Sequence, residues 1–290
     1  MLDPWVPDLP ITIFREDMLM PKIRAGNLSV NYDQQGYGPP LVLIPYLATD
    51  HACYAFQVPE YAKQFTCVSI DLRGTGETDK PQEPYSFEVL ADDVAAFMQA
   101  AGIPKAHVFG LSFGASVGTW LAAKYPDKVL SLSLHSAWSK TDPFLHAVVE
   151  SWRLLANAVG VPETVIRGMF PWCFRPELYT ARPELIDGLS AFVRSRSEQA
   201  LSDFMLQSDA VLAHDAEAQL ARITVPTQIT FGRHDRLTST RFADGLTSGI
   251  RHSELVIFED SAHVAIYDSP DEFNQKTLAF LQRCARLASV

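Results

Sequence analysis

Short apolar runs alternate along the chain with stretches of helical periodicity. Apolar residues between Leu90 and Ala101 recur at the spacing of one helical face, which predicts an amphipathic helix with Ser86 at its N-cap. The apolar runs are uninterrupted rather than alternating with polar residues, which is typical of strands that helices cover on both faces of a sheet. Six buried strands are predicted, at 41–44, 67–70, 107–109, 129–134, 227–231 and 255–258.

This alternation predicts an α/β fold with a mostly parallel central sheet and right-handed crossovers. An antiparallel hairpin is expected to lead into it, with Gly26-Asn27 at the turn. The stretch from about Ser139 to Arg222 has helical periodicity, several prolines and no convincing strand, and it is too long for a loop. We therefore expect three parts: an N-terminal arm at 1–20, a core domain at 21–138 and 223–290, and a helical cap at 139–222.

Composition narrows the class of protein. Among 290 residues, 24 Lys and Arg stand against 34 Asp and Glu, and a net charge of −10 argues against binding to nucleic acid or anionic membranes. No run approaches the length of a membrane span, and residues 1–20 lack the pattern of a signal peptide. The four cysteines are widely spaced, as in bystander thiols of a reducing compartment. We expect a cytoplasmic protein whose partner is a small-molecule substrate, either as a monomer or as a homodimer.

One five-residue motif, Gly110-Leu-Ser-Phe-Gly114, stands where a predicted strand turns into a predicted helix. A serine on such a tight turn has a strained backbone, which is tolerated only if its neighbours are small. The strain lifts the Ser112 hydroxyl clear of the sheet, and the helix N-terminus favours negative charge that develops there. The motif predicts that Ser112 is a nucleophile.

A serine hydroxyl needs a base to remove its proton. Of the eight histidines, His263 lies in a loop directly after the last predicted strand. His107 and His135 flank apolar strands, and for each we expect a structural role. The other five have no strand-end position that converges on Ser112.

The base in turn needs an acid that holds its tautomer. Asp235 comes four residues after the strand that ends at Phe231, and Asp142 comes eight residues after the strand that ends at Leu134. The shorter tether restricts the carboxylate to the sheet edge, so it favours Asp235. Asp142 stands just before Pro143 and is equally suited to capping a helix.

The order Ser112, Asp235, His263 is that of one known triad architecture. From about Ile23 to Leu281 the chain resembles enzymes of the α/β-hydrolase fold. Four further segments are similar to family motifs: Ile70-Asp-Leu-Arg-Gly-Thr-Gly76, Tyr125-Pro-Asp-Lys-Val129, 225–232 and Ser269-Pro-Asp-Glu-Phe-Asn274. Within the family it resembles small capped hydrolases, namely 3-oxoadipate enol-lactonases, aminoacrylate-hydrolase-like proteins and small-molecule esterases.

The resemblance implies a serine hydrolase that cleaves a small carboxylic ester or lactone through an acyl-enzyme, with no metal or organic cofactor. Hydrolysis of an amide or a C–C bond with the same triad is an alternative. The fold also hosts catalytically degenerate receptors and binding proteins, although a binding module has no need of all three triad residues.

The resemblance further implies that the backbone N–H groups of Phe113 and Leu47 stabilise the oxyanion. The chain departs from its relatives here, because Tyr46 stands where they usually carry glycine. Three roles are open for Tyr46: its ring narrows the acyl pocket, its hydroxyl donates a hydrogen bond to the substrate, or its ring turns away into the cap interface.

Other residues have both functional and structural interpretations. The turn Arg73-Gly-Thr-Gly-Glu77 lacks the glycine and lysine spacing of a phosphate loop, so we expect a structural turn. Arginines of the predicted cap either clamp a substrate carboxylate or lie on the surface; they include Arg153, Arg167 and Arg175. Aromatic residues near the cap either line a pocket or form core; they are Trp138, Trp152, Trp172 and Phe174, and Trp138 joins Tyr46 as a predicted pocket residue.

Overall fold

The computed structural model describes residues 21–288 and is built on one eight-stranded sheet in the order β1-β2-β4-β3-β5-β6-β7-β8. Neighbouring strands from β4 to β8 are parallel, whereas β2 is antiparallel to both β1 and β4. The predicted α/β fold is confirmed, and the predicted arm at 1–20 lies outside the described residues. The strands are β1 (Lys22–Ala25), β2 (Leu28–Gln35), β3 (Pro40–Ile44), β4 (Thr66–Ile70), β5 (Ala106–Leu111), β6 (Val129–His135), β7 (Thr227–Gly232) and β8 (Ser253–Phe258).

The predicted hairpin is formed by β1 and β2, with Ala25 paired to Leu28 across a two-residue turn. Gly26 has a φ of 61° in that turn, a backbone conformation that glycine adopts without steric cost. The hairpin is therefore specified by its turn residues, and β2 carries it onto the parallel part of the sheet through β4.

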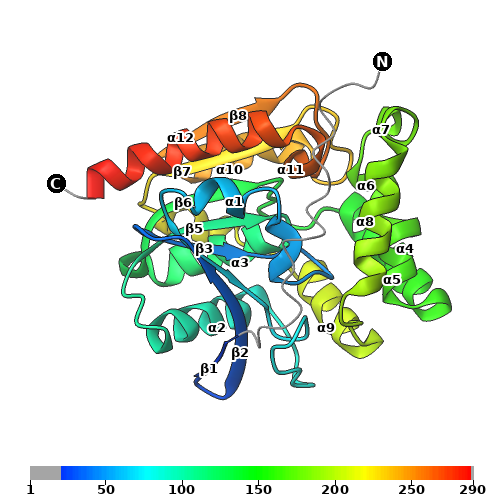
Figure 1. The fold of residues 1–290 in the computed structure, drawn as a ribbon, viewed down its shortest axis with the longest axis horizontal. Helices are drawn as coiled ribbons and strands as arrows, with labels where there is room; N and C mark the ends of the chain where they lie inside the picture. The colour runs from blue at the N-terminus through cyan, green and yellow to red at the C-terminus, as the bar shows by residue number, and fades with distance from the viewer. Residues whose placement is uncertain (1–20, 289–290) are drawn as a thin grey trace.

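Helices cover both faces of the sheet (Figure 1). The helices α2 (Phe87–Ala100) and α3 (Phe113–Lys124) pack together on one face, and α1 (Val58–Tyr61) and α12 (Pro270–Ala288) lie on the other. The predicted N-cap is confirmed, because the Ser86 side chain accepts a hydrogen bond from the Val89 amide. Shorter helices fill the remaining connections: η2 (His51–Tyr54), η3 (Pro126–Lys128), η6 (Thr240–Phe242), α10 (Ala243–Gly249) and α11 (Ala265–Asp268).

Burial along the strands follows from their place in the sheet. The whole of β5 is buried, as expected for a central strand with helices on both faces. The prediction of a buried strand at 255–258 is wrong in one respect, since β8 is mostly half-buried and Leu255 is 42% exposed. The reason is that β8 is an edge strand and has a neighbour on one side only.

The chain between β6 and β7, all of whose residues the structure describes, forms helices joined by loops, and its β-structure is limited to an isolated bridge between Lys140 and Asp215. Its helices stand together at one end of the sheet (Figure 1). We call residues 143–212 the helical segment. It comprises α4 (Pro143–Val159), α5 (Val161–Thr164), the π-helical turn η4 (Val165–Met169), α6 (Phe170–Cys173), α7 (Pro176–Ala181), α8 (Pro183–Ser195) and α9 (Leu201–Leu212), and η5 (Glu217–Arg222) leads from it into β7.

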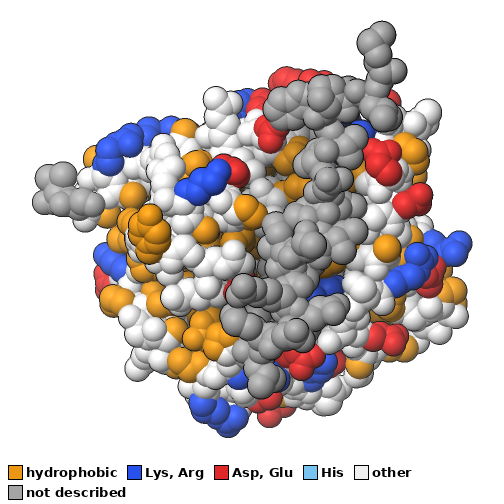
Figure 2. All heavy atoms as spheres, viewed as in Figure 1, with side chains coloured by type: hydrophobic (Ala, Val, Ile, Leu, Met, Phe, Trp, Pro, Cys, Tyr) orange, Lys and Arg blue, Asp and Glu red, His pale blue; other side chains and the backbone are white. Residues whose placement is uncertain are grey.

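The surface in Figure 2 carries basic side chains in separate places among acidic ones, rather than in one basic patch. This distribution matches the negative net charge of the chain. Within residues 21–288, every helix is too short or too polar to span a bilayer.

Candidate active site

Ser112 occupies the turn between β5 and α3 with a φ of 52° and a ψ of −115°, a strained conformation for a residue with a side chain. The glycines of the motif make the turn possible. A Cβ atom on Gly110 would lie 2.3 Å from the carbonyl oxygen of Gly114, and a Cβ on Gly114 would lie 2.2 Å from that of Ile44. The start of α3 therefore packs directly against the end of β3, which brings the loop after β3 beside Ser112.

Asp235 and His263 follow β7 and β8, and their side chains are hydrogen-bonded. The distance from His263 Nδ1 to Asp235 Oδ2 is 3.0 Å, and the two residues are only 3% and 5% exposed, respectively. Burial alone would raise the pKa of Asp235, but the charge and hydrogen bonds of its neighbours hold this pKa below its usual value. The carboxylate is thus kept ionised beside the imidazole.

Asp235 is held in place by three other hydrogen bonds. Its Oδ1 accepts from the amides of Leu237 and Thr238, at 2.8 and 3.1 Å. Its Oδ2 lies 2.9 Å from the Thr238 hydroxyl, which is also 3.2 Å from His263 Nδ1 and 3.0 Å from the carbonyl of Ser136. Neither Thr238 nor Ser136 was predicted as a site residue. The available signal was that Ser136 directly follows β6 and that Thr238 lies three residues after Asp235.

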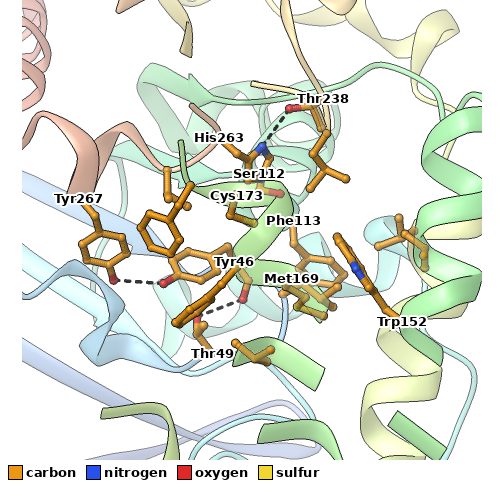
Figure 3. Close-up of a pocket in the computed structure, with 18 of the residues that line it drawn as sticks. Tyr46, Thr49, Ser112, Phe113, Trp152, Met169, Cys173, Thr238, His263 and Tyr267 are labelled. Carbon is orange, nitrogen blue, oxygen red and sulfur yellow. Dashed lines mark hydrogen bonds between the residues drawn. The ribbon is translucent and has the colours of Figure 1, made fainter. Parts of the chain in front are cut away.

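Ser112 and His263 line the same cavity, together with Thr238 (Figure 3). The empty space in and at the mouth of the cavity, open solvent included, is about 880 Å³. The helical segment supplies about half of its wall with apolar side chains, among them Trp152, Met169 and Phe174. The nucleophile and base candidates therefore meet at a space enclosed jointly by the sheet and the helical segment.

The two predicted oxyanion donors, Leu47 and Phe113, also line this cavity. Among the described residues, neither backbone amide has a hydrogen-bond acceptor. An amide in that state at a buried site is ready to donate to a ligand atom.

Tyr46 lines the cavity with its ring, and its hydroxyl lies 3.1 Å from the Tyr267 hydroxyl. Tyr267 donates its own proton to the carbonyl of Cys53, 2.7 Å away. Because a hydroxyl has a single proton, Tyr46 is the donor to Tyr267 and has no proton left for a substrate. Of the three roles left open for Tyr46, donation to a substrate is thereby excluded in this arrangement.

The other predicted pocket residues are divided between cavity and core. Trp138 lines the cavity, although its indole N–H is bonded to Thr141 at 3.0 Å. Trp152 and Phe174 line it as well, whereas Trp172 instead packs against Phe144.

The hypothesis that arginines of the helical segment clamp a substrate is not supported by their positions. None of the three arginines is among the described residues that line the cavity. Arg153 pairs with Asp209 and Arg167 with Glu163, so both neutralise acidic groups of the same segment.

The alternative acid, Asp142, caps α4 by accepting a hydrogen bond from the Leu145 amide at 2.7 Å, and it pairs with Arg241. The two flanking histidines have structural partners: His107 Nδ1 is bonded to Ser131 and His135 Nδ1 to Thr230, both at 2.8 Å. These contacts agree with the capping and structural roles that the sequence indicated.

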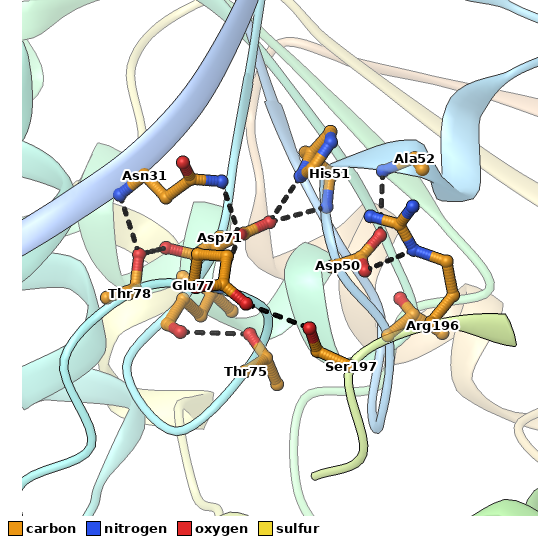
Figure 4. A network of polar contacts seen from close by, with 12 residues as sticks. Asn31, Asp50, His51, Ala52, Asp71, Thr75, Glu77, Thr78, Arg196 and Ser197 are labelled. Carbon is orange, nitrogen blue, oxygen red and sulfur yellow. Dashed lines mark hydrogen bonds and ion pairs between the residues drawn. The ribbon is translucent and has the colours of Figure 1, made fainter. Parts of the chain in front are cut away.

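Asp50, His51 and Asp71 form a cluster with the spacing of metal ligands, and Figure 4 shows why it is better described as structural. Asp71 accepts hydrogen bonds from the Asn31 side chain, the Glu77 amide, and both the amide and ring of His51. Asp50 is paired with Arg196 at 2.7 Å. The carboxylates thus already have partners, and Asp71 organises the Arg73-Gly-Thr-Gly-Glu77 turn.

Residues 39–160 match the family model described as the alpha/beta hydrolase fold. The chain is 29% identical over 258 residues to the AB hydrolase superfamily protein YisY of Bacillus subtilis, covering 84% of this chain and 92% of that protein. It is 25% identical over 280 residues to 3-oxoadipate enol-lactonase 2 of Acinetobacter baylyi, covering 95% and 99%.

Among solved structures, the enol-lactonase from Burkholderia xenovorans superposes with a TM-score of 0.82 at 24% identity, over 90% of this chain and 100% of that one. This likeness concerns the fold and agrees with the strand order described above. The chain has the α/β-hydrolase fold, and it resembles an AB hydrolase superfamily protein and an enol-lactonase over 84% and 95% of its length.

Proposed function

We propose that the protein cleaves small carboxylic esters or lactones through an acyl-enzyme formed on Ser112. The observation that carries this proposal is the meeting of Ser112 and His263 at one cavity, with Asp235 hydrogen-bonded to the far nitrogen of His263. The relative from Acinetobacter baylyi, named as an enol-lactonase, supports a lactone or ester bond as the target.

In the first half of the reaction, the Ser112 oxygen attacks the carbonyl carbon while His263 Nε2 takes the serine proton. The carbonyl oxygen becomes an oxyanion, and the amides of Phe113 and Leu47 donate to it; loss of one such donor typically costs about 3 kcal/mol of barrier. His263 then gives its proton to the leaving alkoxide oxygen, and the acyl group stays on Ser112.

In the second half, a water molecule takes the place of the alcohol. His263 removes a proton from this water as it attacks the acyl carbon, and it returns a proton to Ser112 as the acid leaves. Asp235 keeps the Nδ1 proton of His263 in place and stabilises the imidazolium in both halves.

We assign residues 139–222 the role of a cap that shapes the substrate cavity. The assignment is supported by the apolar side chains that the helical segment contributes to the wall, such as Trp152 and Met169. We also propose a cytoplasmic location, supported by the four cysteine thiols, all of which are free and three of which are buried.

The test is labelling by a fluorophosphonate probe together with hydrolysis of p-nitrophenyl acetate. We expect Ser112→Ala to lose both. The matched control is Ser116→Ala, one turn further along α3, because the Ser116 hydroxyl is buried with no hydrogen-bond partner in the described structure. Turnover by Ser112→Ala above a few per cent of the wild-type rate would exclude the acyl-enzyme mechanism.

A further inference from the structure

Among the described residues that line the cavity, no side chain outside the proposed catalytic residues has a strong hydrogen-bond donor left for a substrate. Of the described residues that line it, none is Lys, Arg, Asp or Glu. A charged group of a substrate would therefore find no opposite charge there, and burial of an unpaired charge is strongly unfavourable.

The tyrosine and threonine hydroxyls of the wall already donate their protons to acceptors within the protein. Tyr46 donates to Tyr267, and Tyr267 donates to the Cys53 carbonyl. Thr49 donates to the Tyr46 carbonyl at 3.2 Å. The Thr238 proton has two acceptors within reach, the Ser136 carbonyl and the Asp235 carboxylate.

The two indole N–H groups of the wall also donate to acceptors within the protein. The N–H of Trp138 donates to Thr141, and the N–H of Trp152 donates to the carbonyl of Gly168, each at 3.0 Å. What remains is the Cys173 thiol, and a thiol is a weak donor. Apart from the proposed catalytic groups, the described wall thus offers hydrocarbon and aromatic surface but no strong side-chain donor that could solvate a carboxylate.

A smaller pocket adjoins the cavity and shares Thr49, Val165, Phe192 and Val193 with it. Its cation, Arg196, donates to Asp50 at 2.7 Å, and Glu198 also lines it. The formal charge of this pocket is therefore negative rather than positive, and it provides no binding site for an anionic group either.

We infer that the substrate is an uncharged ester or lactone whose body, apart from the reacting carbonyl, is hydrocarbon, and that the cavity rejects esters bearing a second, ionised carboxylate. This inference rests on the proposed function and narrows its substrate class. It also separates this chain from an enzyme for a dicarboxylic lactone, for which the wall would need a cationic or donating group.

Three p-nitrophenyl esters that share a six-carbon acyl chain test the inference: the hexanoate, the adipate monoester with a free carboxylate, and the methyl ester of that adipate. At pH 8 we expect kcat/KM for the free carboxylate to be at least about 100-fold lower than for the hexanoate, because its charge is desolvated without a partner. The methyl ester removes the charge and is one methyl group longer than the free acid, and we expect it within about tenfold of the hexanoate.

A free-carboxylate ester cleaved within tenfold of the hexanoate would overturn the inference. A methyl ester as poor as the free acid would also overturn it, because size rather than charge would then decide. If none of the three esters is cleaved and the fluorophosphonate probe fails to label Ser112, the proposed function itself is wrong, so the two failures are distinguishable.

A variant provides an independent check. Val193 is half-buried where the two pockets adjoin, so a longer flexible side chain can be placed there. We expect Val193→Lys to raise the rate of the free carboxylate relative to the hexanoate by about tenfold, through the added ammonium. Val193→Met is the uncharged control of similar length, and an equal ratio in both variants would contradict a role of charge.

Discussion

The Ser136 hydroxyl donates a 2.7 Å hydrogen bond to the main-chain carbonyl of His263. Ser136 directly follows β6, and it is one of four described non-glycine residues with a positive φ, here 50°. Its own carbonyl accepts a hydrogen bond from Thr238. One strained residue thus contacts the loop that carries His263 and the loop that carries Asp235, and such strain persists only where surrounding structure maintains it.

Replacement of Ser136 by alanine tests whether this contact positions His263. Ser136→Ala leaves a buried carbonyl without its donor, at a cost of about 1–3 kcal/mol. We expect a folded protein whose kcat falls about tenfold while KM changes little, because the base is displaced and the cavity wall is intact. The control is Ser133→Ala in β6, three residues before Ser136, where the buried hydroxyl has no partner among the described residues. Equal kcat values in the two variants would rule out a positioning role.

The meeting of Ser112, Asp235 and His263 was predictable because each follows a strand, and parallel strands end at one edge of the sheet. The cavity wall was not predictable in the same way. Trp152 and Met169 belong to helices whose path over the sheet depends on tertiary packing, and no local pattern distinguishes a lining side chain from a core one. The ion-pair partners of polar side chains could not be predicted either, because they lie far apart in the sequence. Arg153, for example, pairs with Asp209, which lies 56 residues further along the chain.

The nucleophile turn depends on a close approach of backbones at Gly114. A Cβ at this position would lie 2.2 Å from the Ile44 carbonyl oxygen and 2.7 Å from that of Pro45, so Gly114→Ala must displace α3 or the loop after β3. We expect a loss of several kcal/mol in unfolding free energy, measured by denaturant titration, and loss of activity in any protein that still folds.

The matched control is Gly118→Ala in the same helix. Its Cβ would meet only side-chain atoms, the nearest being Leu132 Cδ1 at 3.3 Å, and alanine favours the helix by about 1 kcal/mol. We expect a change in stability of no more than about 1 kcal/mol. If both variants lost the same stability, the close approach at Gly114 would not be the cause.

The two candidate acids are separated by matched amide variants. In Asp235→Asn, the new NH₂ competes with the His263 Nδ1 proton and favours the wrong tautomer, a change that costs about 10⁴ in kcat in the serine-protease template. Asp142→Asn keeps an oxygen for the Leu145 amide and loses only a half-exposed ion pair with Arg241, so we expect kcat within a few-fold of wild type. Steady-state kinetics with p-nitrophenyl acetate decides between them, and the reverse result would make Asp142 the acid.

Three buried histidines predict a loss of stability in acid. Burial lowers the pKa of His107 and His214 to about 4 and that of His135 to about 3. In the unfolded chain each titrates near pH 6.5, so between pH 6.5 and 4 the unfolded state binds more protons. Their stabilisation is therefore present above pH 6.5 and is lost as the pH falls, by about 2 kcal/mol per histidine at pH 5.

The measurement is the denaturant midpoint between pH 8 and pH 5 for the wild type and for His107→Gln. We expect the variant to lose less stability over this range, because one of the three titrations is gone. His252 is exposed, so His252→Gln serves as the control and should keep the wild-type slope. A slope for His107→Gln that equals the wild-type slope would exclude this histidine as a source of the acid sensitivity.

Tyr46 provides the last test, because its ring lines the cavity and its hydroxyl bond to Tyr267 holds the ring there. Tyr46→Gly removes the ring, and we expect kcat/KM for p-nitrophenyl octanoate relative to the acetate to rise about tenfold as the wall recedes. Tyr46→Phe keeps the ring and loses only its bond to Tyr267, so its chain-length preference should stay within about twofold of wild type. An unchanged preference in folded Tyr46→Gly would mean that the ring does not limit the acyl group, and other residues of the wall would then set its length.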